Sequence, residues 1–91
     1  MDVNLAQRLE GFIGEALRKY SYKEVRFRAE CKRGKCYIYA EGPLGSFSSP
    51  SIPHGKIRDA LDTESNGDRY ALEQLVTEMA RTAGAQRAVQ P

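Results

Sequence analysis

The segment VRFRAECKRGKCYIYAEG, residues 25–42, has the pattern of a β-hairpin with its turn in the middle. Apolar residues alternate with charged residues in its first half and with tyrosines in its second half, as in strands that have one buried face. Lys32-Arg33-Gly34-Lys35 separates the two halves, and glycine readily adopts the positive φ that tight turns require. The segment therefore predicts two antiparallel strands joined by a short turn.

The position of this turn predicts which residues lie opposite each other in the hairpin. A two-residue loop at Arg33-Gly34 and a four-residue loop give the same register, with Cys31 opposite Cys36. The register predicts an inner, apolar face made by Phe27, Ala29, Cys31, Cys36, Ile38 and Ala40. The outer face is predicted to carry Arg26, Arg28, Glu30, Tyr37, Tyr39 and Glu41.

Apolar residues recur at helical spacing on both sides of the hairpin. Residues 5–20 predict one amphipathic helix, residues 56–61 a short helix, and residues 68–83 a second long helix. Residues 42–55 contain three prolines and three glycines, which favours a long loop. Phe47 and its flanking serines could form a short third strand within that loop.

The order of these elements predicts an α+β domain. We expect a long N-terminal helix, an antiparallel β-hairpin with or without a third strand, a short helix and a long C-terminal helix, with the helices packed on one face of the sheet. A chain of 91 residues makes one domain, which we expect to span residues 1–84 and to be followed by a flexible tail over residues 85–91. The sequence leaves open whether the protein is a monomer or a homodimer.

The cysteine count and the N-terminal sequence bear on the cellular compartment. The first residues, MDVNLAQRLEG, are helically patterned and lack the features of a secretory signal, and no apolar run approaches the roughly 20 residues of a membrane span. We therefore expect a cytoplasmic protein without membrane contact. In that reducing setting Cys31 and Cys36 are predicted to be buried thiols, although their opposed positions would also allow a disulfide.

Candidate catalytic and metal-binding groups are few. His54 is the only histidine, and several serines lie near it, but no nucleophile elbow, phosphate-binding loop or pair of carboxylates accompanies it. A zinc site would need further ligands beside the two cysteines, and the sequence offers only His54 and scattered acidic residues. We therefore predict a non-catalytic protein with no cofactor and no metal.

The net charge of +2 is unevenly distributed along the chain. Residues 18–35 contain eight Lys and Arg against two Glu, whereas residues 59–78 contain six Asp and Glu against one Arg. This asymmetry predicts one basic and one acidic surface. A basic surface attracts nucleic acid or an acidic protein.

The outer face of the hairpin is the predicted contact surface. Flat aromatic rings on a strand can stack with bases, and neighbouring basic groups can neutralise phosphates. The predicted binding residues are Arg26, Arg28, Lys32, Arg33, Lys35, Tyr37 and Tyr39. The leading hypothesis is a small module that binds RNA or single-stranded DNA. The alternative is an adaptor or inhibitor, of regulatory or phage type, whose basic hairpin docks on an acidic protein surface.

Overall fold

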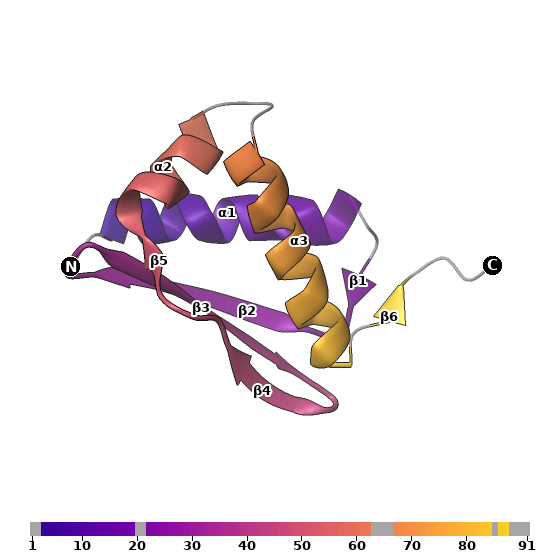
Figure 1. Cartoon of the computed structure of the whole chain (residues 1–91). Helices are drawn as coiled ribbons and strands as arrows, with labels where there is room; N and C mark the ends of the chain where they lie inside the picture. Colours follow the sequence, from indigo (N-terminus) through magenta and orange to yellow (C-terminus); the bar gives the residue numbers. More distant parts are fainter. Residues whose placement is uncertain (1–2, 20–21, 63–66, 85, 88–91) are drawn as a thin grey trace.

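The computed structural model describes residues 3–19, 22–62, 67–84 and 86–87, and these form an α+β fold (Figure 1). The helices are α1 (Val3–Lys19), α2 (His54–Asp62) and α3 (Gly67–Thr82). The strands are β1 (Tyr22–Lys23), β2 (Arg26–Lys32), β3 (Lys35–Gly42), β4 (Gly45–Ser48), β5 (Ile52–Pro53) and β6 (Gln86–Arg87). The three predicted helices are therefore present with similar bounds. None of the helices in these ranges has the length and apolar composition that a membrane span requires.

The main sheet is antiparallel and has the order β2-β3-β4, with β5 also paired to β3. The predicted hairpin register is confirmed, because Cys31 pairs with Cys36 and Arg28 with Tyr39. Arg33 and Gly34 form the two-residue turn with φ values of 54° and 78°. Positive φ at both positions is what the favoured two-residue hairpin turn requires.

Half of the segment predicted as a long loop, seven of its fourteen residues, lies in strands. The third strand around Phe47 is confirmed as β4, which returns along β3 after a tight turn that places Gly42 opposite Gly45. Strand β5, in which Ile52 lies opposite Cys36, was not predicted. Its proline is tolerated because β5 is a two-residue strand at the margin of the sheet.

Ser49 joins the two short strands to β3. Its hydroxyl accepts a hydrogen bond from the Ile38 N–H at 3.0 Å, and its own N–H donates to the Ile38 carbonyl at 2.8 Å. The same hydroxyl donates to the Pro50 carbonyl at 2.9 Å. Between β4 and β5, hydrogen bonds from this buried serine therefore continue the pairing of the chain with β3.

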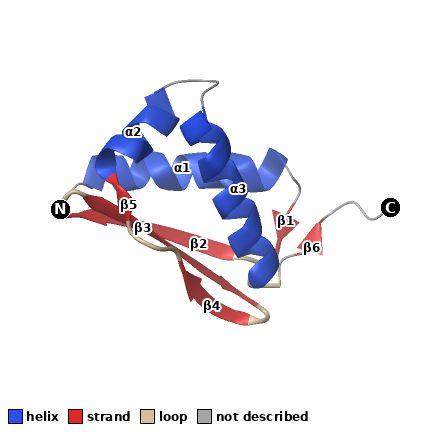
Figure 2. Cartoon of the chain, viewed as in Figure 1, coloured by secondary structure: helices blue, strands red, loops and turns tan. Residues whose placement is uncertain are grey.

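The hydrophobic core lies between the sheet and the helices, which all lie on the same side of the sheet (Figure 2). The inner hairpin face is buried as predicted, apart from Phe27, which is half-buried. The helices contribute most of the other core side chains, namely Leu5, Leu9, Phe12, Ile13, Ala16, Ile57, Ala60, Leu72, Val76 and Met79. The alternating pattern of the hairpin thus separates a covered face from an uncovered one.

Polar contacts also attach the helices to the sheet. The Glu10 carboxylate on α1 accepts a hydrogen bond from the Ala29 N–H of β2 at 2.9 Å. After α3, the Ala83 carbonyl accepts one from the Leu44 N–H, in the β3–β4 turn, at 3.0 Å. That approach requires a glycine at position 42, because a Cβ there would clash with the same Ala83 oxygen.

The chain after α3 includes a paired segment. Gln86 and Arg87 form β6, which pairs with β1 in a separate two-stranded sheet. These residues fall in the segment predicted as a flexible tail. The rest of that segment, residues 85 and 88–91, lies outside the described residues.

Candidate binding surface

The outer face of β2 and β3 carries the side chains that the alternating pattern assigned to it. Arg28 and Tyr39 lie directly opposite each other, and the guanidinium carbon is 4.8 Å from the centre of the tyrosine ring. Tyr37, opposite Glu30, is half-buried like Tyr39, and Arg26 is exposed. Since all described helices lie on the other side of the sheet (Figure 2), these groups are open to a partner.

A groove runs across this part of the sheet. It has a volume of about 610 Å³ and is lined by Arg26, Phe27, Arg28, Tyr39, Ala40, Glu41, Ser46, Phe47 and Ser48. The register places Ser48 opposite Tyr39 and Ser46 opposite Glu41, so β4 widens the surface that the hairpin begins. The groove therefore combines two arginines and an aromatic ring with small hydroxyl groups.

The β2–β3 turn forms a basic tip at the end of this face, consisting of Lys32, Arg33 and Lys35, all exposed. Lys32 is partly neutralised, because its ammonium nitrogen is 3.2 Å from a Glu30 carboxylate oxygen. Within the described part of the chain, Arg33 and Lys35 form no ion pair, and neither does Arg26 near the other end of the hairpin. These three cations remain available to a negatively charged ligand.

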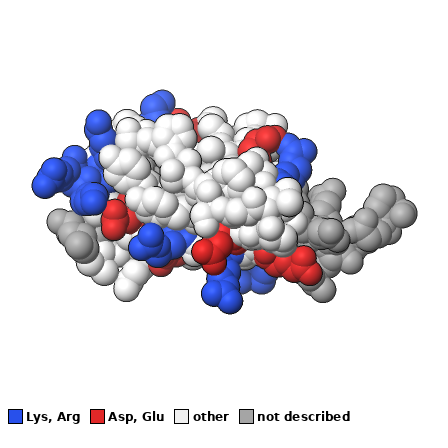
Figure 3. All heavy atoms as spheres, turned by 90° about the horizontal axis from the view of Figure 1, so that it is seen from below, with Lys and Arg blue, Asp and Glu red and all other residues white. Residues whose placement is uncertain are grey.

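The charge of the outer face is less uniform than the sequence predicts. Figure 3 views the molecule from this side and shows the largest group of Lys and Arg at the end where the β2–β3 turn lies, further basic and acidic groups along the edges, and a mostly uncharged middle. Arg18 and Lys19 are at the far end of α1, away from the turn (Figure 1), and the Lys19 ammonium is 3.5 Å from Glu73. The basic residues of the segment 18–35 therefore do not form one continuous surface.

The acidic residues of the segment 59–78 are also distributed among ion pairs. Asp68 lies 3.7 Å from the Lys56 ammonium, and Glu78 contacts Arg81 on the same helix. Asp62 contacts Arg8 of α1. A separate acidic surface was expected from this segment, but tertiary packing brings basic partners to Asp62, Asp68 and Glu73.

The expectation that Cys31 and Cys36 are thiols is wrong for this structure, in which the two residues form a disulfide. Their directly opposed positions bring the Cα atoms within 4.0 Å, so the two sulfurs are within bonding reach. The prediction gave more weight to the presumed reducing compartment than to this geometry.

His54, the first residue of α2, lies beside this disulfide, a contact that the sequence analysis missed. Its ring nitrogen and the two sulfur atoms all lie within 4.8 Å of one another. One feature of the sequence could have predicted this contact. An isolated hairpin is marginally stable and needs further strands. A strand formed by the residues just before His54, paired with β3, would bring His54 close to Cys36. The two cysteines and the histidine that the sequence offered as possible zinc ligands therefore lie together in space.

No protein-family model, curated protein or solved structure matches this chain significantly. Functional inference therefore depends on the chemistry and geometry of the surfaces described above. Of the predicted contact residues, Arg26, Arg28 and Tyr39 line one groove, Tyr37 lies on the same face, and the remaining three form the basic tip.

Proposed function

We propose that the outer face of the sheet binds single-stranded nucleic acid, and that the protein is a binding module rather than an enzyme. The observation that carries this proposal is the stacked pair of Arg28 and Tyr39 in an uncovered groove. A tyrosine ring on a strand provides a flat surface on which an unpaired base can stack, and the adjacent guanidinium can contact the base or its phosphate.

The basic groups divide into two roles along the hairpin. Arg26 and Arg28 line the groove and neutralise phosphates next to the stacked bases, whereas Arg33 and Lys35 extend the positive charge to the tip. Tyr37 lies on the same face and offers a second ring. The seven residues of β2 span about 23 Å, so the surface is long enough to follow an extended strand.

A single strand fits this surface better than a duplex does. Duplex binding depends on many phosphate contacts and therefore on an extended basic surface. The middle of this face is mostly uncharged (Figure 3), and its distinctive groups are aromatic and hydroxylic. Such groups recognise bases that are not already stacked in a duplex.

Fluorescence anisotropy with labelled single-stranded RNA and DNA oligonucleotides tests the proposal. We expect binding at low salt, with the logarithm of the association constant falling by about 0.7 per neutralised phosphate for each tenfold rise in salt. Tyr39→Ala should weaken binding by about 1–3 kcal/mol through the loss of one stacking surface. Tyr70→Ala is the matched control, because Tyr70 is 66% exposed on α3, away from the sheet, and should bind like the unmodified protein.

The same titration distinguishes the alternative partner. If neither oligonucleotide binds at low salt, the nucleic-acid proposal fails, and docking of the basic tip on an acidic protein becomes the better account. That alternative is favoured by Arg33 and Lys35, which are exposed and form no ion pair with any other described residue. In that case Arg33→Glu should abolish capture of an acidic partner, while Tyr39→Ala should have little effect.

A further inference from the structure

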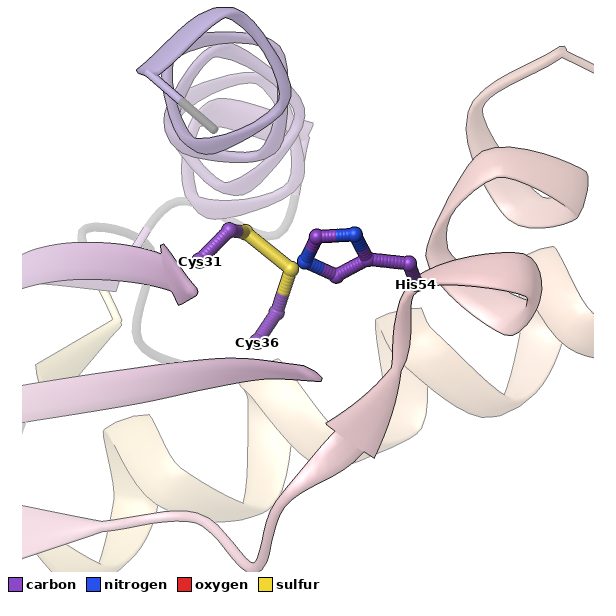
Figure 4. A group of neighbouring side chains, drawn as sticks. All are labelled: Cys31, Cys36 and His54. Carbon is purple, nitrogen blue, oxygen red and sulfur yellow. A yellow bond between two sulfur atoms is a disulfide. The ribbon is translucent and has the colours of Figure 1, made fainter. Parts of the chain in front are cut away.

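A second cluster of reactive groups lies at the tip of the hairpin, on the inner side of the sheet. Cys31 is near the end of β2, Cys36 near the start of β3, and His54 at the start of α2. Figure 4 shows the edge of the imidazole ring pointing at the disulfide. Both cysteines are almost completely buried, with exposed fractions of 1% and 0%.

His54 has an unsatisfied nitrogen in this arrangement. Its Nε2 atom is buried and has no hydrogen-bond partner among the residues that the structure describes. Buried polar atoms in folded proteins almost always have a partner, so an exception calls for an explanation. A disulfide sulfur is a poor partner, whereas a metal ion held by the same two sulfurs would use this nitrogen as a ligand.

The backbone fixes the position of His54 relative to the cysteines. Its N–H donates to the Gly34 carbonyl, inside the hairpin turn, at 2.9 Å. The two residues before it form β5, which pairs with β3 and places Ile52 opposite Cys36. On the following helix, Ile57 is buried in the core. The imidazole is therefore held at the hairpin tip by contacts that do not depend on the disulfide.

We propose that reduction of the Cys31–Cys36 disulfide converts this cluster into a zinc site with two cysteine ligands and one histidine ligand. A thiol reductant supplies two electrons and two protons to the S–S bond, which yields two cysteine thiols and the disulfide of the reductant. Zn²⁺ then binds both sulfurs as thiolates and the His54 Nε2, and the two thiol protons are released. This site lies on the inner side of the sheet, whereas the proposed nucleic-acid surface is the outer face.

The geometry and the donor set suit zinc. Zinc–sulfur bonds of about 2.3 Å and zinc–nitrogen bonds of about 2.0 Å in a tetrahedron place the ligand atoms roughly 3.5–3.8 Å apart. The three candidate ligand atoms already lie within 4.8 Å of one another, so breaking the S–S bond leaves only small shifts to complete the arrangement. Thiolate and imidazole ligands together select soft or borderline metals. The two cysteines and the histidine occupy three of the four tetrahedral positions of zinc, which leaves the fourth for water.

The test compares the oxidised and the reduced protein without any substitution. The disulfide is reduced with a phosphine, which becomes a phosphine oxide with oxygen from water, and Zn²⁺ is titrated in competition with a chromophoric chelator. We expect one equivalent of Zn²⁺ to bind to the reduced protein and none to the oxidised protein. Cobalt(II) replaces zinc in a parallel titration, and its visible spectrum should show tetrahedral coordination with sulfur ligands.

Variants separate the role of His54 from that of the cysteines. His54→Ala should weaken zinc binding by the reduced protein by roughly tenfold or more, since even outer-shell changes at metal sites cost about 10–100-fold. Ser51→Ala is the matched control in the same segment and should bind normally, because Ser51 is exposed and outside the cluster.

Two results would overturn the proposal. One is a reduced protein that binds zinc no more tightly than the oxidised protein. The other is equal zinc affinity in the reduced His54→Ala variant and the reduced unmodified protein. If reduction unfolds the chain, circular dichroism replaces the affinity comparison. The proposal then predicts that zinc restores the spectrum of the folded protein, and a spectrum that stays unfolded with zinc would contradict it.

Discussion

The two faces of the β2–β3 hairpin belong to the same strands and follow from the same register, but one face is buried and the other is uncovered. On the inner face, small and aliphatic side chains are buried under the three helices. On the outer face, which the described helices leave uncovered, Arg26, Arg28 and Tyr39 line a groove. The comparison teaches that one alternating sequence specifies both the stability of the fold and the chemistry of a surface, and that the two can be changed separately.

The largest effect is expected on the inner face. Ile38 is completely buried in the middle of β3, so Ile38→Ala removes packed methyl and methylene groups and leaves a cavity. We expect the free energy of unfolding to fall by about 2–5 kcal/mol, measured by denaturant titration. Its outer neighbour Tyr37 provides the matched comparison. If Tyr37→Ala destabilised the fold as strongly, the distinction between the two faces would fail.

An intermediate effect is expected where β4 and β5 join β3. Ser49→Ala removes the hydroxyl that accepts the Ile38 N–H, which leaves a buried donor without a partner. The free energy of unfolding should fall by about 1–3 kcal/mol. Ser48→Ala, at an exposed position of β4, should change it by less than about 0.5 kcal/mol. Equal effects of the two substitutions would show that the buried hydroxyl does not hold the short strands to the sheet.

The smallest effect on stability is expected on the outer face. Arg28→Ala removes an exposed cation from the Tyr39 ring, and such contacts contribute about 0.5–1 kcal/mol. The same substitution should weaken oligonucleotide binding and lower the salt dependence by about 0.7 in logarithmic slope. Thermal unfolding and anisotropy on the same sample separate the two effects. A large loss of stability with unchanged binding would assign Arg28 to the fold rather than to the contact surface.

The sequence was sufficient to predict the hairpin and the helices. Gly34 located the turn, and the period of two then specified which residues pair and which face each side chain occupies. The helical spacing of apolar residues predicted α1, α2 and α3 with similar bounds. These features depend on local patterns, so a single sequence contains them.

The remaining features depend on contacts between distant segments. Strand β5 has no local strand pattern and exists because Ile52 and Pro53 pair with β3. Ion pairs between residues far apart in the chain, such as Arg8 and Asp62, neutralise part of the acidic segment 59–78. The contact of His54 with the cysteines likewise follows from the pairing of β5, which composition and spacing do not reveal.

The central claim is that the outer face of the sheet is the nucleic-acid contact surface. The most direct measurement is NMR chemical-shift mapping during titration with a single-stranded oligonucleotide. The account predicts that signals of Arg28, Tyr37, Tyr39 and Ser48 shift progressively, while those of exposed helix residues such as Arg58 and Tyr70 stay in place. Shifts confined to the helices, or none at all at low salt, would contradict it.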